Sequence, residues 1–178
     1  MKIILMSGEK KDYDKSIVNI SSFIKSTYNV KYIYASKNKG SIYTLETLYQ
    51  ILDDPDINIT HTSNLNINYK NADKITDITD VDLWDRTDKY HATVKKMRSD
   101  TDEDISKRLR SIYGNITSQH LNTDNYDIVI IADKLIIASF VEELYRINRY
   151  FTYRNIGCFI SVINTKNNLL DLHRFYIL

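Results

Sequence analysis

The sequence predicts a three-layer α/β fold with a mostly parallel sheet. Two blocks, residues 1–54 and 126–178, alternate short apolar runs with segments whose apolar residues recur at helical spacing. The runs are continuously apolar, which is typical of strands buried on both faces. We expect one domain over residues 1–178, whose core comes from these two blocks. Residues 55–125 are expected to form an inserted element with helices and a hairpin.

The composition limits what the protein does. The 178 residues include 24 Lys and Arg and 23 Asp and Glu, which gives a net charge of +1 and argues against a globally basic nucleic-acid binder. No run approaches ~18 apolar residues, so we expect neither a membrane span nor a membrane partner. The one cysteine, Cys158, excludes an internal disulfide and a multi-cysteine zinc site, and it fits an intracellular location.

The first block is predicted to form a strand, a helix, a second strand and a second helix. The second helix ends at Asp53-Asp54-Pro55, and residues 37–41 before it are expected to be a loop. The four predicted elements are the strand Lys2–Met6, the helix 16–28, the strand Val30–Ala35 and the helix Thr44–Leu52.

The middle of the chain is more polar. Alternating apolar residues over 57–59 and 65–69 predict a half-exposed hairpin. We expect a loop over 71–80 and a helix over 81–97. A second helix over 101–113 has Thr101 as its cap, acidic residues in its first turn, and Gly114 after its end.

The second block repeats the α/β pattern. We expect strands over 127–132 and 156–163, with a helix over 140–150 between them. The tail, 169–178, alternates apolar and polar residues and predicts an edge strand.

Two patterns near the first strand are candidates for catalysis. Ser7-Gly8 follows that strand and Lys15-Ser16 opens a helix, as in a phosphate loop, but the spacing is too long and Asp14 would repel phosphate. Ser7 also stands where nucleophiles occur in open α/β sheets. The histidines fit no metal spacing, so neither a metal nor a cofactor is expected. They are His61, His91, His120 and His173.

Two basic clusters are candidate interaction surfaces. The first is interleaved with acidic residues and is a candidate for nucleic acid, although a solvated mixed-charge face is favoured; it comprises Lys95, Lys96, Arg98, Lys107, Arg108 and Arg110. The second joins arginine to tyrosine and is a candidate interface with a protein partner or a second copy of the chain. It comprises Tyr145, Arg146, Arg149, Tyr150, Tyr153 and Arg154.

The order of elements in the two blocks resembles the catalytic domain of serine recombinases, the resolvase/invertase family. The resemblance depends on two parts of the chain. The first part comprises the strand Lys2–Met6 and the stretch from Tyr32 to Lys37 with Gly40-Ser41. The second comprises Asp127 to Ala132, the helix that follows, and Asn155 to Ser161. The resemblance implies a resolvase-like fold. Recombinase-like proteins of a degenerate kind occur in the poxvirus group, which would place the chain in a host cytoplasm or nucleus.

The family's catalytic residues are not matched here. An ungapped alignment puts Gly8 at an arginine and Lys10 at the serine nucleophile, whereas a shifted one puts Ser7 at the nucleophile. Leu45 stands for another arginine, and Asp133-Lys134 match only part of the family's Asp-Arg-Leu-x-Arg motif. Each lost charge-stabilising donor costs ~10²–10³ in rate. The resemblance therefore implies an inactive recombinase-like domain, not an enzyme, reused for protein interaction or self-association, with weak nucleic-acid binding as an option.

A second resemblance leads to a different function. Three stretches are similar to viral deoxynucleoside monophosphate kinases: Ser7-Gly8-x-Lys10-Lys11, residues 108–114, and Asp171-x-His173. This alternative implies a nucleotide-binding phosphotransferase whose phosphate loop is distorted.

Overall fold

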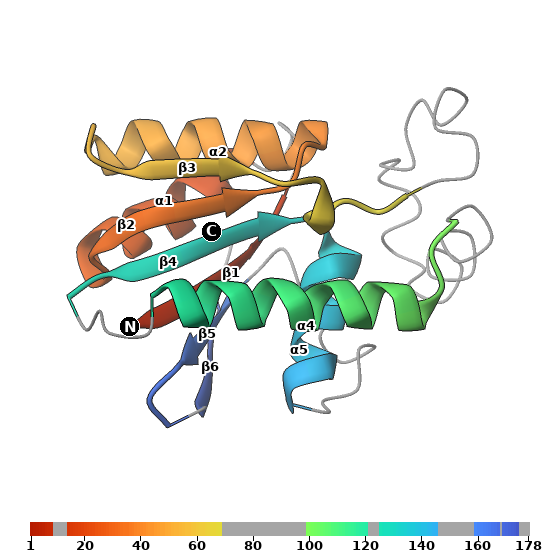
Figure 1. Ribbon diagram of the computed structural model, residues 1–178. Coiled ribbons are helices and arrows are strands. Elements are labelled where there is room, and N and C mark those ends of the chain that lie inside the picture. Colours follow the sequence, from red (N-terminus) through yellow and green to blue (C-terminus); the bar gives the residue numbers. More distant parts are fainter. Residues whose placement is uncertain (9–13, 69–98, 121–124, 146–158, 168, 175–178) are drawn as a thin grey trace.

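A six-stranded mixed sheet with helices on both faces forms the framework of the molecule (Figure 1). The computed structural model describes residues 1–8, 14–68, 99–120, 125–145, 159–167 and 169–174. The strand order is β3-β2-β4-β1-β5-β6. The strands are β1 Lys2–Ser7, β2 Val30–Ala35, β3 Asn58–His61, β4 Asp127–Ala132, β5 Phe159–Asn164 and β6 Leu169–Arg174.

Three of the five strand pairings are parallel and two are antiparallel, so that β5 alone of the six strands runs against the others. β4 lies between β2 and β1 and is parallel to both, with Leu5 opposite Ile130 and Ile33 opposite Val129. β5 is antiparallel to β1, and β6 is antiparallel to β5. The predicted α/β class with a mostly parallel sheet is therefore confirmed.

The two faces of the sheet bury two separate cores. On β1, Ile3 and Leu5 pack toward α4 (Asp102–Gln119) and α5 (Lys134–Tyr145). Ile4 and Met6 pack toward α1 (Asp14–Thr27) and α2 (Lys39–Leu52). Because successive side chains of a strand point to opposite faces, a strand covered on both sides must be apolar throughout.

Three helices begin or end differently from the sequence prediction. α2 begins at Lys39, because the Asn38 side chain accepts a hydrogen bond from the Ser41 N–H at 2.6 Å and caps the helix. α4 continues past Gly114 to Gln119, since Ile116 packs into the core on its far side. α5 begins at Lys134, six residues before the predicted start, and the preceding Asp133 accepts the Leu135 N–H at 2.8 Å.

The predicted hairpin in residues 57–69 is wrong. β3 pairs in parallel with β2, with Tyr34 opposite Thr60, and a 3-10 turn over Ser63–Leu65 follows it. Leu65 and Ile67 then enter the core on the α4 side. The alternating pattern arose from one exposed edge strand and one buried segment, which a period-2 pattern does not distinguish from a hairpin.

Several predicted elements fall partly or wholly outside the described residues. They are the loop 71–80, the helix 81–97, residues 146–150 of the helix after β4, residues 156–158 with Cys158, and residues 175–178 of the tail. The boundaries of an insertion at 55–125 also stay a prediction, although β3 and α4 contribute to the sheet and its cover.

Candidate functional site

The parallel strands end together at one edge of the sheet, and this carboxyl edge is the candidate site. The register places His61 opposite Ala35 and Ala35 opposite Ile131, while Ser7 lies opposite Ala132. The chain moves outward from β1 to β3 and returns with β4 between β2 and β1. Open α/β sheets bind ligands beyond the carboxyl ends of their strands, where the strand order reverses.

Gly8, directly after β1, packs against the first turn of α2. A Cβ on Gly8 would overlap Ser41 Oγ and lie 2.7 Å from Ser41 N and 2.8 Å from Ser41 Cα, so only glycine fits there. The Gly8 N–H donates to the Ala132 carbonyl at 2.6 Å, which extends the strand pairing by one bond. This close approach brings the ends of β1 and β4 together with the N-terminus of α2.

Small hydroxyl side chains line the same edge. Ser36, just after β2, donates from Oγ to Ser41 Oγ at 2.8 Å, and both residues are fully buried. Ser7 at the end of β1 is 7% exposed. The edge is therefore built from small polar groups and backbone amides rather than from large side chains.

The charges at this edge are distributed unevenly. Lys37 and Lys39 are exposed on either side of the α2 cap, where the positive end of the helix dipole adds to their charge. Asp133 occupies the corresponding position at the start of α5 as its cap. An anion would be favoured at the α2 side of the edge and disfavoured beside Asp133.

The structure brings some of the predicted site residues together and separates others. Ser7, Gly8 and Asp133 meet at the carboxyl edge. Leu45 is buried in the core under α2, so it takes no part in the site. Lys134 begins α5, and Lys10 lies outside the described residues.

The phosphate-loop pattern is not reproduced. α1 begins at Asp14, so Lys15 and Ser16 lie inside its first turn, with Lys15 exposed and Ser16 buried. A phosphate loop instead needs backbone amides converging just ahead of the helix.

The basic residues of α4 are all paired with carboxylates. Lys107 lies 2.9 Å from Glu103, Arg108 lies 2.8 Å from Asp100, and the third pair joins Arg110 to Glu143 at 3.4 Å. This agrees with the mixed-charge interpretation of these three. Lys95, Lys96 and Arg98 lie outside the described residues, and nucleic-acid binding stays a prediction.

The arginine–tyrosine cluster is described only at its first member. Tyr145 ends α5 half-buried, and burial raises the pKa of its hydroxyl to about 12. The interface prediction stays a prediction, because its other members are outside the described residues. Those are Arg146, Arg149, Tyr150, Tyr153 and Arg154.

A buried histidine cluster, which sequence reasoning missed, lies on the α4 side of the sheet. His120 caps the end of α4, with Nε2 3.1 Å from the Tyr34 hydroxyl and Nδ1 2.7 Å from the Tyr126 hydroxyl. The Tyr32 ring is tilted by 56° against the His120 ring, with the two ring centroids 4.5 Å apart. Burial lowers the pKa of His120. The four residues are scattered along the chain, so only the fold brings them together, away from the carboxyl edge.

Two kinds of feature are absent from the part of the chain that the structure describes. No cluster of three His, Cys, Asp or Glu side chains there could hold a metal ion. No helix there is long and apolar enough to cross a bilayer.

Solved structures with a similar fold include phosphatases and phosphoglycerate mutases. The α-ribazole phosphatase of Shigella flexneri is 10% identical, with a TM-score of 0.61 over 98% of this chain and 96% of its own. The phosphoserine phosphatase of Entamoeba histolytica, in complex with 3-phosphoglyceric acid, is 11% identical, with a TM-score of 0.61 over 99% and 97%. The phosphoglycerate mutase of Bacillus anthracis is 11% identical, with a TM-score of 0.61 over 97% and 92%.

Comparisons at the level of sequence find no counterpart. No protein-family profile matches the chain, and no curated protein matches it. Identities this low establish the fold alone. The chain has an α/β fold consistent with that of phosphoglycerate mutase.

These findings correct the expectations that rested on resemblance. The structures similar to this chain are not serine recombinases, and no resolvase fold is present, so the inactive-recombinase interpretation is wrong. The kinase alternative is not supported either. The prediction of a non-enzyme is corrected too, because the proteins that share the fold are phosphatases and mutases. Nothing in the comparisons supports a viral origin. Order of elements was a poor guide, because α/β folds share it widely.

Proposed function

We propose that the protein binds a small phosphate monoester at the carboxyl edge of its sheet and catalyses phosphoryl transfer from it. Structures with this fold are named for α-ribazole-5′-phosphate, phosphoserine and phosphoglycerate, and all three of these compounds are phosphate monoesters. Their identity to this chain is too low to carry the assignment, so the argument depends on the chain's own residues.

The contact between Gly8 and Ser41 is the observation that carries the proposal. It places the N-terminus of α2 beside the end of β1, with Lys37 and Lys39 flanking it. A phosphate dianion is stabilised by a helix N-terminus, by backbone amides and by cations together. The edge supplies the helix N-terminus and the cations, whereas the Gly8, Ser36, Lys37 and Ser41 amides already donate within the fold.

We assign the acceptor role to the Ser7 hydroxyl, because Ser7 directly precedes Gly8 at this edge. Ser7 ends β1, whereas His61 ends β3, which lies beyond β2 and β4, and His120 lies on the α4 side. In the transfer, the bond between phosphorus and the ester oxygen breaks and the alcohol leaves with a proton. The phosphoryl group passes to Ser7 Oγ or directly to water. In the first case water then releases it as phosphate.

Phosphate release from defined substrates tests this activity. The purified protein is incubated with 3-phosphoglycerate, phosphoserine and p-nitrophenyl phosphate, and inorganic phosphate is measured. We expect turnover of at least one substrate, and Ser7→Ala should lower kcat/KM by about tenfold or more, which corresponds to ~1.4 kcal/mol of transition-state stabilisation. Ser118→Ala, on the exposed end of α4, is the matched control and should leave kcat/KM unchanged.

The chemical stability of a trapped phosphoryl-protein separates the two routes. Phosphoserine survives acid whereas phosphohistidine does not, so an acid-stable adduct that disappears in Ser7→Ala assigns Ser7 as the acceptor. Turnover without an adduct indicates direct attack by water. If no monoester is hydrolysed and none raises the melting temperature at concentrations far above its expected Kd, the proposal is wrong.

A further inference from the structure

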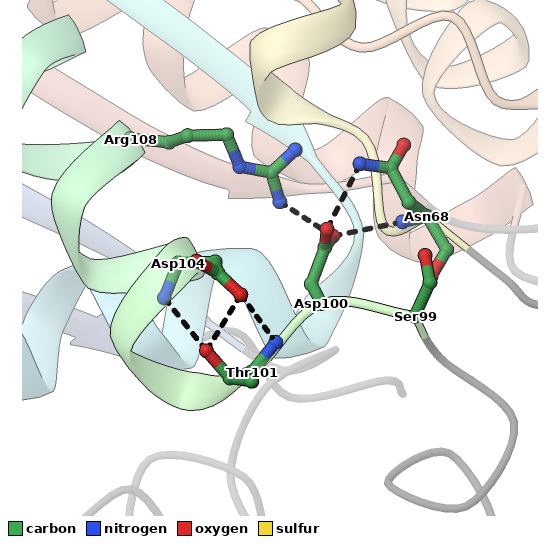
Figure 2. A network of polar contacts seen from close by, with 6 residues as sticks. All are labelled: Asn68, Ser99, Asp100, Thr101, Asp104 and Arg108. Atoms are coloured by element: carbon green, nitrogen blue, oxygen red, sulfur yellow. Dashed lines mark hydrogen bonds and ion pairs between the residues drawn. The ribbon is translucent and has the colours of Figure 1, made fainter.

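A polar network joins two points of the chain that are far apart in sequence (Figure 2). The Asn68 backbone N–H and side-chain Nδ2 donate to the two carboxylate oxygens of Asp100, at 3.1 Å and 3.0 Å. The Asn68 carbonyl accepts from the Ser99 N–H at 2.7 Å and from the Ser99 hydroxyl at 3.1 Å. Four hydrogen bonds therefore hold the chain at residue 68 to the chain at residues 99 and 100.

Both sides of this network are anchored in the domain. Arg108, one turn and a half into α4, donates to Asp100 Oδ2 at 2.8 Å, and the two side chains are only 22% and 12% exposed. Thr101 and Asp104 form a capping box that fixes the start of α4, and hydrogen bonding from Thr101 lowers the pKa of Asp104. We call the group Asn68, Ser99, Asp100 and Arg108 the latch.

Apolar contacts lie next to the latch on each side. Leu65 and Ile67 precede it, Ile105 and Leu109 follow it on α4, and all four are buried in one core. The described chain thus has buried core residues close to the latch on both sides of it.

The sheet interleaves the two parts of the chain on either side of the latch. Residues 1–68 supply β1, β2 and β3, while residues 99–178 supply β4, β5 and β6. β4 lies between β2 and β1, and β5 pairs with β1 on its other side. Three strand interfaces therefore join the two parts, and separating the parts would break all three.

We propose that the latch closes the domain, so that the fold does not require a continuous chain through residues 69–98. The domain is then a two-part assembly, and the inserted element narrows from residues 55–125 to residues 69–98. A protease that cuts within this segment would leave both parts bound to each other in the native sheet. The inference rests on the sheet order and the latch and is independent of the proposed function.

A single engineered cut in the full-length chain tests the inference. A recognition sequence for a site-specific protease is inserted between Asp80 and Val81, and the purified protein is cleaved. We expect the fragments to co-elute in native buffer, to keep the circular dichroism of the uncut protein, and to separate only in denaturant. The cut protein should also melt at a temperature that rises with protein concentration, since its unfolded state consists of two chains. Separation in native buffer, or loss of the dichroism signal, would overturn the inference.

A pair of asparagine substitutions tests the latch itself in the cut protein. Asn68→Ala removes a side-chain bond to a carboxylate and should lower the melting temperature by about 2–4 °C. Asn64→Ala, at an exposed position four residues earlier whose side chain has no hydrogen bond among the described residues, is the matched control and should cause no shift. Equal melting temperatures for the two variants would show that the latch does not hold the parts together.

Discussion

The two ends of the parallel strands are held together by different kinds of group. At the amino edge, the Asp127 carboxylate accepts the Lys2 N–H at 2.8 Å and the Asn29 N–H at 3.2 Å, and so ties β4 to both neighbouring strands. At the carboxyl edge the links are mainly backbone bonds, from Gly8 to Ala132 and from Ser36 to Ile131.

The contrast shows which edge is free to bind. Side chains at the amino edge accept hydrogen bonds from the strand backbone. Close by, both ring nitrogens of His120 are hydrogen-bonded to tyrosine hydroxyls. At the carboxyl edge, small residues let backbone approach backbone, so Lys37 and Lys39 remain exposed for other contacts. Polar groups that stabilise the fold and polar groups available to a ligand are thereby placed at opposite ends of the strands.

The largest effect is expected from filling the close approach at the carboxyl edge. Gly8→Val would drive a branched side chain into the backbone of Ser41 and should lower the free energy of unfolding by about 3 kcal/mol. Urea unfolding measures the loss. Gly114→Ala is the control, because an added methyl there meets nothing within 4 Å, and this change should instead raise stability by about 0.5–1 kcal/mol. If Gly8→Val left the free energy of unfolding unchanged, the close approach at the carboxyl edge would not constrain the size of residue 8.

Removing the carboxylate at the amino edge should have the next largest effect. Asp127→Ala leaves the Lys2 and Asn29 amides without their acceptor and should cost about 2 kcal/mol, since hydrogen bonds to charged groups are the stronger ones. Glu46→Ala removes the same charge from an exposed position on α2 and serves as the control. Ligand binding at the carboxyl edge should be unchanged in Asp127→Ala, and a large loss of affinity would contradict the separation of roles.

A smaller effect should follow from lowering the pH. Burial lowers the pKa of His120 below its ordinary value near 6.5, so the unfolded chain binds a proton before the folded one does. The contribution of neutral His120 to the free energy of unfolding is complete above about pH 6.5. It is lost as the pH falls toward the pKa of His120 in the folded state. Unfolding free energies of wild type and His120→Gln, measured across this range, should converge as the pH falls. A His120→Gln curve that runs parallel to that of wild type would refute the prediction.

The smallest effect on stability is expected from the exposed lysines. Lys37→Ala combined with Lys39→Ala should change the unfolding free energy by less than about 0.5 kcal/mol, because both side chains are on the surface. The same variant should weaken phosphate-ester binding, measured as a smaller ligand-induced shift in melting temperature. A loss of stability with unchanged binding would assign these lysines to the fold instead.

The sequence predicted the strands well where one pattern of apolar residues ran through the whole element. β1, β2 and β4 agree with the apolar runs to within one residue, because strands buried on both faces leave an unambiguous pattern. Patterns failed at caps and edges. The position of Asn38 before the helix was a signal for the start of α2 that went unused, whereas β3 resembled half of a hairpin.

The candidate site was predictable only in part. Ser7 is predictable because it follows a strand. Ser36 and Ser41 lie in stretches that suggested only the recombinase resemblance, and their contact depends on the packing of α2. The family was misjudged for a related reason, since the order of strands and helices does not specify how the strands are arranged in the sheet.

The sequence alone determined the α/β class, the buried strands and the near-neutral surface, because periodicity and composition are local properties of the chain. The tertiary structure decided that β4 lies between β2 and β1 and that Gly8 meets Ser41. It also decided that Asn68 meets Asp100 and that His120 lies among tyrosines. Each of these contacts joins residues far apart in sequence. Such contacts form only when burial of both faces of the sheet repays the entropy of closing the intervening loops.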